Sequence, residues 1–530
     1  MNGQVYLGWA LPYQKETISP VISRVIRGIV LLLASLPIAG FVSSSRVLAQ
    51  VTPAQDGAGT RVNQNGDRYT IDGGALSRDG ANLFHSFEQF GLDANQTANF
   101  LTNSQIQNIL GRVTGGDASI IHGLIQVTGG DSNLYLLNPA GIIFGADARL
   151  DVSGSFTATT ADGVGFGNRW MSAIADNNYA SLVGNPGSFA FTSVQPGSIL
   201  NSGSLRVSEG QQLTLLGGTV INTGTLTAPG GQITVAAVPG ENLVRISQSG
   251  QLLSLELETI GEAGIGGLGL PFTPLSLPEL LTAGAVDHAT GVTVNRDGSV
   301  SLTGSGIALS TEPGTAIASG TLNASSRTAR SSSEINILGD RVALLDATLN
   351  ASGQGNGGTI RVGGDYQGAG SVPNASVTFV DENSVLSADA LSRGNGGRII
   401  VWSDETTRVY GSLSARGGAQ IGNGGLVETS SHGFLDVEGA PDVSARYGLA
   451  GTWLIDPYNI TIADAPTNRI DATDDPFLAI ANDAVLDVND LIAALTGGAN
   501  VIVSTGTAGR KLATLPFKQR WIRRDGAATR

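Results

Sequence analysis

The chain has no cysteine among its 530 residues, which excludes disulfide frameworks, thiolate metal sites and cysteine nucleophiles. Aromatic residues make up only 5% of the chain and charged residues 14%. The 74 glycines are roughly twice the usual share, which makes a helical bundle improbable. No Gly-x-y period runs through the chain, so collagen is excluded, and short alternating runs of Val, Ile and Leu argue against disorder. These features predict an all-β chain with many turns.

Positive charge is also scarce. The chain has 30 basic and 44 acidic residues, a formal net charge of −14. Neutralising phosphate requires clustered Lys and Arg, so we expect no nucleic-acid partner. The lack of cysteine also suits a protein that crosses an oxidising periplasm unfolded.

The first 49 residues have the pattern of an export signal. Basic residues precede an apolar run at 29–42, and small or apolar residues stand at −3 and −1 of a cleavage point after Ala49. The alternative is a membrane anchor, but the run of 14 residues is shorter than the roughly 20 needed to span a bilayer. We therefore predict a signal peptide at 1–49.

Repeated sequence words run along the chain. Leu-Asn-Ser-Gly-Ser-Leu at 200–205 recurs as Ile-Asn-Thr-Gly-Thr-Leu at 221–226, a step of 21 residues. Leu-Asn-Ala-Ser at 322–325 recurs at 349–352, a step of 27. A second word, Gly-Asn-Gly-Gly followed by alternating apolar residues, occurs at 355–358, 394–397 and 422–425. Self-similarity of this length indicates a repeat architecture.

The repeat length predicts how the chain folds. A step of 20–30 residues holds about three short strands and three corners, one coil of a parallel β-solenoid, with Gly and Asn at the corners. Equivalent Asn, Ser and Thr side chains of successive coils should then stack. An antiparallel sandwich also has short strands and turns, but it does not predict near-identical words one coil apart. We expect a solenoid shaft at 191–509.

Two segments interrupt the repeats. Residues 251–296 contain a glycine-rich piece and three prolines, which indicates an excursion from the shaft with one helical turn. A second excursion is expected at 368–375, where the step between repeated words is ten residues longer than on either side.

The segment before the shaft carries a family resemblance. It contains Phe-His-Ser-Phe at 84–87, Phe-Leu-Thr-Asn at 100–103, Ile-Leu-Gly-Arg-Val at 109–113 and Asn-Pro-Ala-Gly-Ile at 138–142. With these words, residues 50–190 resemble the haemagglutination-activity domain of filamentous-haemagglutinin-type exoproteins, which are exported by two-partner secretion. Ala140 stands where the family usually has Asn. Gly-Thr-Trp-Leu-Ile-Asp-Pro at 451–457 is similar to a phrase common in large cyanobacterial members.

The resemblance implies a right-handed parallel β-helix, a solenoid of the pectin-lyase-like class. It also implies that an outer-membrane barrel transporter with periplasmic POTRA domains recognises the N-terminal domain, and that the chain crosses unfolded and folds outside. Asn-Pro at 138–139 is a turn with restricted φ, so it is expected to form a corner of the helix and also to belong to the recognition surface. The residues that match the secretion motif are Asn103, Arg112, Asn138, Pro139, Gly141 and Ile142.

No pattern in the chain predicts a catalytic, cofactor or metal site. The histidines are far apart, and the glycine-rich piece at 264–269 lacks the ending of a phosphate loop. Polysaccharide-acting β-helical enzymes need clustered carboxylates, but adjacent residues of a strand point to opposite faces. The candidate carboxylate groups are Asp381 with Glu382, Asp404 with Glu405, and Asp471 with Asp474 and Asp475. The last group could hold Ca²⁺, although a solvated loop is favoured.

The C-terminal segment differs in composition. Residues 510–530 contain seven basic residues and one acidic residue, whereas no lysine occurs between Gln50 and Gly509. The change falls within a repeat, which suggests a frameshifted or truncated reading frame; the alternative is a native basic tail.

The sequence thus predicts a secreted, adhesin-like, non-enzymatic surface exoprotein, exported through the periplasm and outer membrane to the medium or the cell surface. Cell-surface glycans or other cells are the further partners expected. The alternatives are a β-helical enzyme acting on polysaccharide and a structural surface-layer component. The enzyme would have a groove with converging carboxylates on adjacent coils.

Overall fold

The computed structural model describes residues 50–246, 255–259, 292–294, 300–302, 308–309, 312–328, 333–370, 372–456, 460–463, 484–503, 522–524 and 527–529. The predicted signal peptide at 1–49 lies outside these residues, as does most of the predicted excursion at 251–296. Of the basic tail at 510–530, only two short strands are described.

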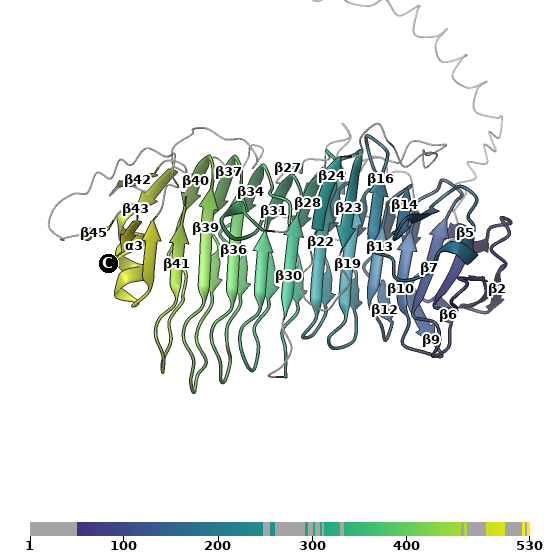
Figure 1. Ribbon diagram of the computed structural model, residues 1–530, viewed down its shortest axis with the longest axis horizontal. Coiled ribbons are helices and arrows are strands. Elements are labelled where there is room, and N and C mark those ends of the chain that lie inside the picture. Colours follow the sequence, from purple (N-terminus) through teal and green to yellow (C-terminus); the bar gives the residue numbers. More distant parts are fainter. Residues whose placement is uncertain are drawn as a thin grey trace, which may run out of the picture. The chain divides into compact units, whose positions relative to one another are not determined.

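Three long sheets, here called A, B and C, contain most of the strands. From β7 to β38, each coil supplies one strand to sheet A, the next to sheet C and the third to sheet B, as in β19 (Gln212–Gly217), β20 (Val220–Asn222) and β21 (Thr225–Thr227). The chain then returns to sheet A one position along. Figure 1 shows the strands of sheet A side by side in chain order, from β7 to β41.

The strands of each sheet are given in chain order. Sheet A consists of β1 (Val51–Pro53), β4 (Ala75–Leu76), β5 (Asn82–Phe90), β7 (Asn108–Val113), β10 (Asn133–Leu137), β13 (Phe156–Thr159), β19, β22 (Gln232–Ala237), β30 (Glu334–Leu338), β33 (Thr359–Val362), β36 (Arg398–Ser403), β39 (Leu426–Ser431), β41 (Thr452–Ile455), β44 (Asn500–Val503), β45 (Ile522–Arg524) and β46 (Ala527–Thr529). Sheet B consists of β2 (Thr60–Asn65), β3 (Arg68–Gly73), β6 (Thr97–Leu101), β9 (Leu124–Thr128), β12 (Arg149–Asp151), β18 (Ser204–Arg206), β21, β29 (Thr321–Asn323), β32 (Thr348–Asn350), β35 (Val385–Ser387) and β38 (Ser412–Ser414). Sheet C consists of β8 (Ser119–Ile121), β11 (Ile142–Phe144), β17 (Ile199–Asn201), β20, β28 (Thr315–Ala318), β31 (Arg341–Leu344), β34 (Val377–Val380), β37 (Thr406–Val409), β40 (Phe434–Val437), β42 (Ile460–Ala463) and β43 (Ala484–Asp487).

The repeated words occupy equivalent places on successive coils. Leu200 pairs with Ile221 in sheet C, and Leu322 pairs with Leu349 in sheet B, both between parallel strands. The alternating apolar residues after the Gly-Gly pairs face inward, so that Ile360 and Ile399 pair with each other and are both fully buried. Each such side chain contributes about 1.5–3 kcal/mol by leaving water. The prediction of an all-β parallel β-helix is confirmed, and the sandwich is excluded.

Asparagine side chains link neighbouring coils, as the repeats predicted. Asn201 donates to the Oδ1 of Asn222, one coil along, at 2.7 Å. In the Gly-Asn-Gly-Gly words, Asn356 Oδ1 accepts from the backbone N–H of Asn395, and Asn395 Oδ1 accepts from that of Asn423, both at 2.8 Å. Asn356 and Asn395 therefore each satisfy a backbone donor of the next coil at a corner where no strand does so.

Antiparallel strands close the N-terminal end of the described helix. β1 pairs antiparallel with β5 in sheet A, while β2 and β3 form a hairpin at the edge of sheet B. Because an open parallel edge would expose unpaired backbone groups, these strands act as a cap.

A second structure lies beside the helix and was not foreseen from the sequence. Strands β14 (Gly163–Phe166), β15 (Arg169–Ser172), β16 (Ser188–Phe191), β23 (Asn242–Ile246) and β24 (Leu255–Thr259) form an antiparallel sheet, here called the side sheet. Its strands come from two excursions, one after β13 and one after β22. Within the second, the predicted helical turn at 251–296 lies outside the described residues. A small sheet is formed by β25 (Val292–Val294), β26 (Val300–Leu302) and β27 (Ala308–Leu309).

The remaining described elements are short. A 3-10 helix, η1 (Tyr179–Ser181), lies in the first excursion, and a second, η2 (Tyr366–Gly368), lies in the connection from β33 to β34, where the second interruption was expected. The helix α3 (Val488–Thr496) precedes β44 and is capped by the carboxylate of Asp487. No helix in these parts of the chain is long and apolar enough to cross a membrane.

Candidate functional site

Asn138 forms a fully buried corner between β10 and β11. Its Nδ2 donates to the carbonyl of Asp117 and to Ser119 Oγ, both at 2.9 Å, and its Oδ1 accepts from the Ala140 N–H at 3.0 Å. One side chain thus holds its own turn and the preceding coil together. This is the structural role expected for the Asn-Pro word.

The rest of this word is also inside the protein. Pro139, Ala140, Gly141 and Ile142 are all buried. Gly141 has a φ of +130°, which only glycine adopts without strain. Ala140 is fully buried, so the small side chain that departs from the family word fits the space available. In the folded chain these side chains are therefore not part of a surface that a partner could contact.

Asn103 lies at a different corner and is exposed. Its Oδ1 accepts from the N–H of Gln105 at 2.9 Å, an Asx turn after β6. The carbonyl of Asn103 contacts the next coil closely, because a Cβ added to Gly130 would lie 2.7 Å from it. The structure therefore does not bring Asn103 together with Asn138 or Arg112 in one site.

Arg112 is buried on the outer face of sheet A, where it joins three parts of the chain. Its guanidinium forms an ion pair with Asp56 in the capping segment at 2.6 Å and donates to Ser86 Oγ in β5 at 3.0 Å. It also donates to the carbonyl of Ser172 at the end of β15, at 2.9 Å, and lies 5.8 Å from the ring centroid of Tyr179 in η1. Arg112 thus holds the cap and the side sheet against the helix.

The charge of this cluster is balanced within it. Burial by itself raises the pKa of the Asp56 carboxyl, but hydrogen bonds from Ser86 and Arg112 outweigh that effect, so the pKa lies below its usual value. Asp56 is therefore ionised at neutral pH, and Arg112 neutralises it. The group stabilises structure and leaves no charge for a ligand.

His85 lies in the helix interior beside Phe87 and Phe100, with ring centroids 6.3 and 5.7 Å away. Neither of its ring nitrogens has a hydrogen-bond partner among the described residues. Burial lowers the pKa of His85 to about 4, so the imidazole is neutral at physiological pH. It fills the core as an aromatic ring in strand β5.

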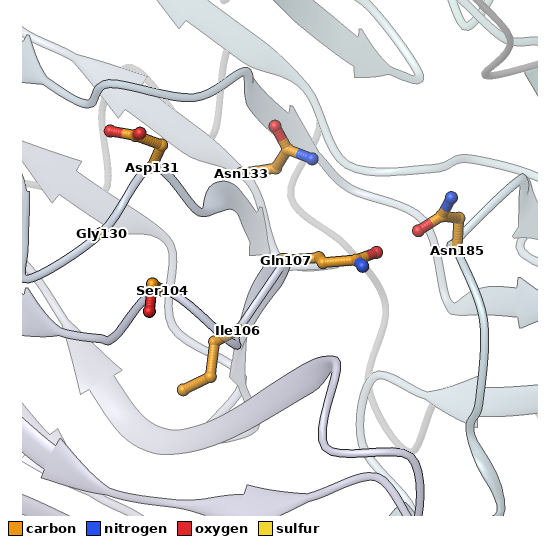
Figure 2. Close-up of a pocket in the computed structure, with 7 residues that line it drawn as sticks. All are labelled: Ser104, Ile106, Gln107, Gly130, Asp131, Asn133 and Asn185. Carbon is orange, nitrogen blue, oxygen red and sulfur yellow. The ribbon is translucent and has the colours of Figure 1, made fainter.

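A polar pocket of about 480 Å³ opens between a corner of the helix and the segment before β16. Figure 2 shows the amides of Gln107 and Asn185 pointing toward each other, with Asn133 nearby. Asn133 is held in place because its Nδ2 donates to Asn108 at 3.0 Å and its Oδ1 accepts from the Ser155 N–H at 2.9 Å. The lining is completed by Ser104, Ile106, Gly130 and Asp131.

The acidic pairs considered in the sequence do not converge. Asp381 lies at the corner between sheets C and B and accepts from the N–H of Asp346. Asp404 lies at the corner between sheets A and C, where its Oδ1 accepts from the indole N–H of Trp402 at 3.2 Å and lies 3.2 Å from Nδ1 of His432. The group at Asp471 lies outside the described residues.

A buried carboxylate on sheet A gave no signal in the sequence. Glu428 in β39 is fully buried beneath the connection that contains η2, between Ile400 and Leu454 of the neighbouring strands. Both of its oxygens accept from the N–H of Gln367, at 3.1 and 3.2 Å. Burial raises the pKa of Glu428 to about 7. The stacking register places position 428 outward, but only the structure shows that the connection covers it.

Comparison with known proteins places the N-terminal part of the chain in a family. Residues 49–270 match the TPS secretion domain. Among solved structures, the chain is similar to the HMW1 secretion domain from Haemophilus influenzae, with 22% identity, a TM-score of 0.40, and 77% of this chain and 99% of that chain covered. It is also similar to a filamentous hemagglutinin secretion domain, with 15% identity, a TM-score of 0.32, and 74% and 99% covered. No curated protein matches.

The family match has direct consequences for the route and partner of this chain. TPS secretion domains belong to exoproteins that an outer-membrane transporter exports to the cell surface or the medium, and the family is not one of enzymes. The resemblance found in the sequence is confirmed. Residues 49–270 are a TPS secretion domain, and the chain is therefore an exoprotein exported by two-partner secretion.

Proposed function

We propose that this exoprotein is a non-enzymatic adhesin whose secretion domain is recognised by the POTRA domains of its transporter. The observation that carries the adhesive role is the stacked-coil shaft, which continues past residue 270 and extends a repetitive surface from the exported domain. Repeat folds present such extended surfaces to partners.

The burial of acidic groups supports a role without catalysis. The carboxylate of Glu428, which has a strongly raised pKa, is fully buried and accepts hydrogen bonds from Gln367. Arg361 on the same sheet is paired with Glu334 and, at 3.1 Å, with Asp365. A glycosidase needs two carboxylates that reach the same bound sugar. The carboxylates of Glu428 and Glu334 on this sheet contact other parts of the protein.

The motif residues support a particular mode of recognition. Asn138 and Arg112 are buried in the folded domain, so a transporter could contact their side chains only before folding. Because the chain crosses unfolded, we propose that the POTRA domains bind residues 50–190 as an extended chain. The same side chains then hold the corner and the cap after export.

Deleting residues 50–190 is expected to abolish release of the protein into the medium. The control is deletion of residues 386–412, which removes one whole coil because Leu386 and Leu413 occupy equivalent positions in sheet B. Export is measured by immunoblotting the medium and the periplasm when the transporter is co-expressed. Continued release of the first variant would contradict the assigned domain.

Neutral glycans are the receptor class that the polar pocket favours. The amide of Gln107 offers a donor and an acceptor, and the Nδ2 of Asn185 offers a donor, while the Oδ1 of Asn185 accepts from Asn108 Nδ2 at 3.2 Å. These groups match the hydroxyls of a sugar. No Lys or Arg lies among the described residues that line the pocket, and Asp131 adds negative charge, so a neutral sugar is preferred over an anionic one.

Replacing Gln107 and Asn185 by leucine is expected to weaken binding of the exported protein to neutral oligosaccharides at least tenfold, because the pocket loses its hydrogen-bonding groups. Binding is measured on a glycan array and by calorimetry. The matched control is Gln354→Leu, which changes an exposed glutamine on the shaft. Unchanged binding in the double variant would rule out this pocket as the glycan site.

A further inference from the structure

Two corners of the β-helix carry different chemistry. The corner that leads from sheet B back to sheet A is formed by successive loops at 388–397, 415–425 and 443–451, here called the arginine corner. The corner that leads from sheet C to sheet B is here called the acidic corner. It contains Asp346, Asp381, Glu382 and Glu438.

The loops of the arginine corner stack in register. A Cβ added to Gly422 would lie 1.6 Å from the carbonyl oxygen of Gly394, and one added to Gly448 would lie 2.1 Å from that of Gly422. The residues that precede these glycines therefore form one row across three coils. They are Arg393, Ile421 and Tyr447.

This row is unusually apolar for an exposed surface. Ile421 is 60% exposed, Tyr447 56% and the neighbouring Leu449 76%. Leu391 on the first loop is also exposed. Single exposed apolar side chains are common, but a cluster on successive repeats indicates an interaction surface.

Positive charge surrounds the apolar side chains. The Arg446 guanidinium lies 5.2 Å from the ring centroid of Tyr447, and Arg393 donates to Gln420 at 2.6 Å. Neither Arg393 nor Arg446 forms an ion pair within the described residues, whereas Arg416 is paired with Asp389. Tyrosine and arginine beside aliphatic side chains are the composition of protein interface hot spots.

The acidic corner of the same protein has complementary charge. Asp346 and Glu382 are exposed on neighbouring coils, and the backbone N–H of Asp346 donates to the Asp381 carboxylate. The coils of both corners repeat at the same spacing, because each coil contributes to both. Rows of charge on two copies could therefore face each other over several coils.

We propose that the arginine corner binds the acidic corner of a second copy of this chain, side by side. Because the two surfaces differ, each copy keeps a free surface of each kind, and association continues beyond a dimer. This inference rests on the proposed adhesive function, for which it supplies the contact between exoproteins on neighbouring cells.

The test uses the purified exported protein in sedimentation-velocity experiments across a concentration series. Association should weaken at high salt and fall at least tenfold in Arg393→Glu/Arg446→Glu and in Asp346→Lys/Glu382→Lys. Mixing these two variants should restore association, because each supplies the charge that the other has lost. The control Val194→Asp, at a 70% exposed site in the first excursion, should associate like the unmodified protein.

Several results would overturn the proposal. The unmodified protein could stay monomeric at all concentrations, the mixed variants could fail to associate, or the arginine corner could bind anionic lipid vesicles and not a second copy. None of these results affects the export or glycan experiments, so failure here is distinguishable from failure of the proposed function.

Discussion

Replacing Arg112 by methionine is expected to destabilise the exported protein by about 3 kcal/mol. Removing one partner of a buried ion pair costs about 3–5 kcal/mol, because the other charge is left without compensation. The lower end applies here, since the Asp56 side chain remains 18% exposed. The variant also leaves the carbonyl of Ser172 without its donor. Urea unfolding followed by tryptophan fluorescence measures the loss, with Trp170 of β15 as the local probe.

Arg61 supplies the matched control for this variant. Its ion pair with Asp72 has the same distance of 2.6 Å, but the Arg61 side chain is 71% exposed. Exposed pairs contribute less than about 1 kcal/mol, so Arg61→Met should be nearly neutral. Adding Asp56→Asn to Arg112→Met should recover part of the lost stability. Equal effects of the two arginine variants would show that burial does not govern the Arg112 cluster.

Replacing Glu428 by glutamine is expected to stabilise the protein above pH 7 and to change little at pH 4. The folded-state pKa of Glu428 is raised from 4.5 to about 7. An acid whose pKa is higher in the folded state than in the unfolded state stabilises the folded state below its unfolded pKa. This stabilisation is lost as the pH rises through the folded-state pKa. This difference between the unfolded and folded pKa values corresponds to a loss of roughly 3 kcal/mol in the free energy of unfolding at high pH. Glutamine cannot ionise, so the variant avoids the loss.

The measurement is the urea midpoint of both proteins from pH 4 to pH 9, with Trp402 of the neighbouring strand as a reporter. The curves should coincide at low pH and separate between pH 4.5 and 7. Glu209→Gln, at an exposed position, should follow the unmodified protein throughout. If the curves of the Glu428→Gln variant and the unmodified protein stayed parallel from pH 4 to pH 9, ionisation of Glu428 would not destabilise the folded state.

The stacking of the helix could be predicted because repeated words mark equivalent positions. The words at 200–205 and 221–226 pair residue by residue in sheets C and B. The asparagine contacts between coils followed from the same repetition. The 27-residue and 37-residue steps placed the interruption that the structure shows between β33 and β34.

The side sheet could not be predicted, because its strands share no word with the shaft. β16 pairs with β23, which lies in a different excursion, so no local pattern marks either strand. The contacts of the Arg112 cluster could not be predicted either. Arg112 was identified by resemblance, but Asp56 is one of 44 acidic residues, and nothing near it in the chain indicates that a distant arginine will reach it.

Because the Gly-Asn-Gly-Gly words are interchangeable, coils of the β-helix could pair out of order during folding. If the growing helix skipped one turn, Asn423 could replace Asn395 at Asn356 and the ladder would still form. The outward residues of sheet A would then be mismatched. Trp402 contacts the connection that contains η2, since a Cβ on Gly368 would lie 2.5 Å from its ring. The irregular connections on the outside of the helix thus disfavour a skipped coil, which the regular interior would tolerate.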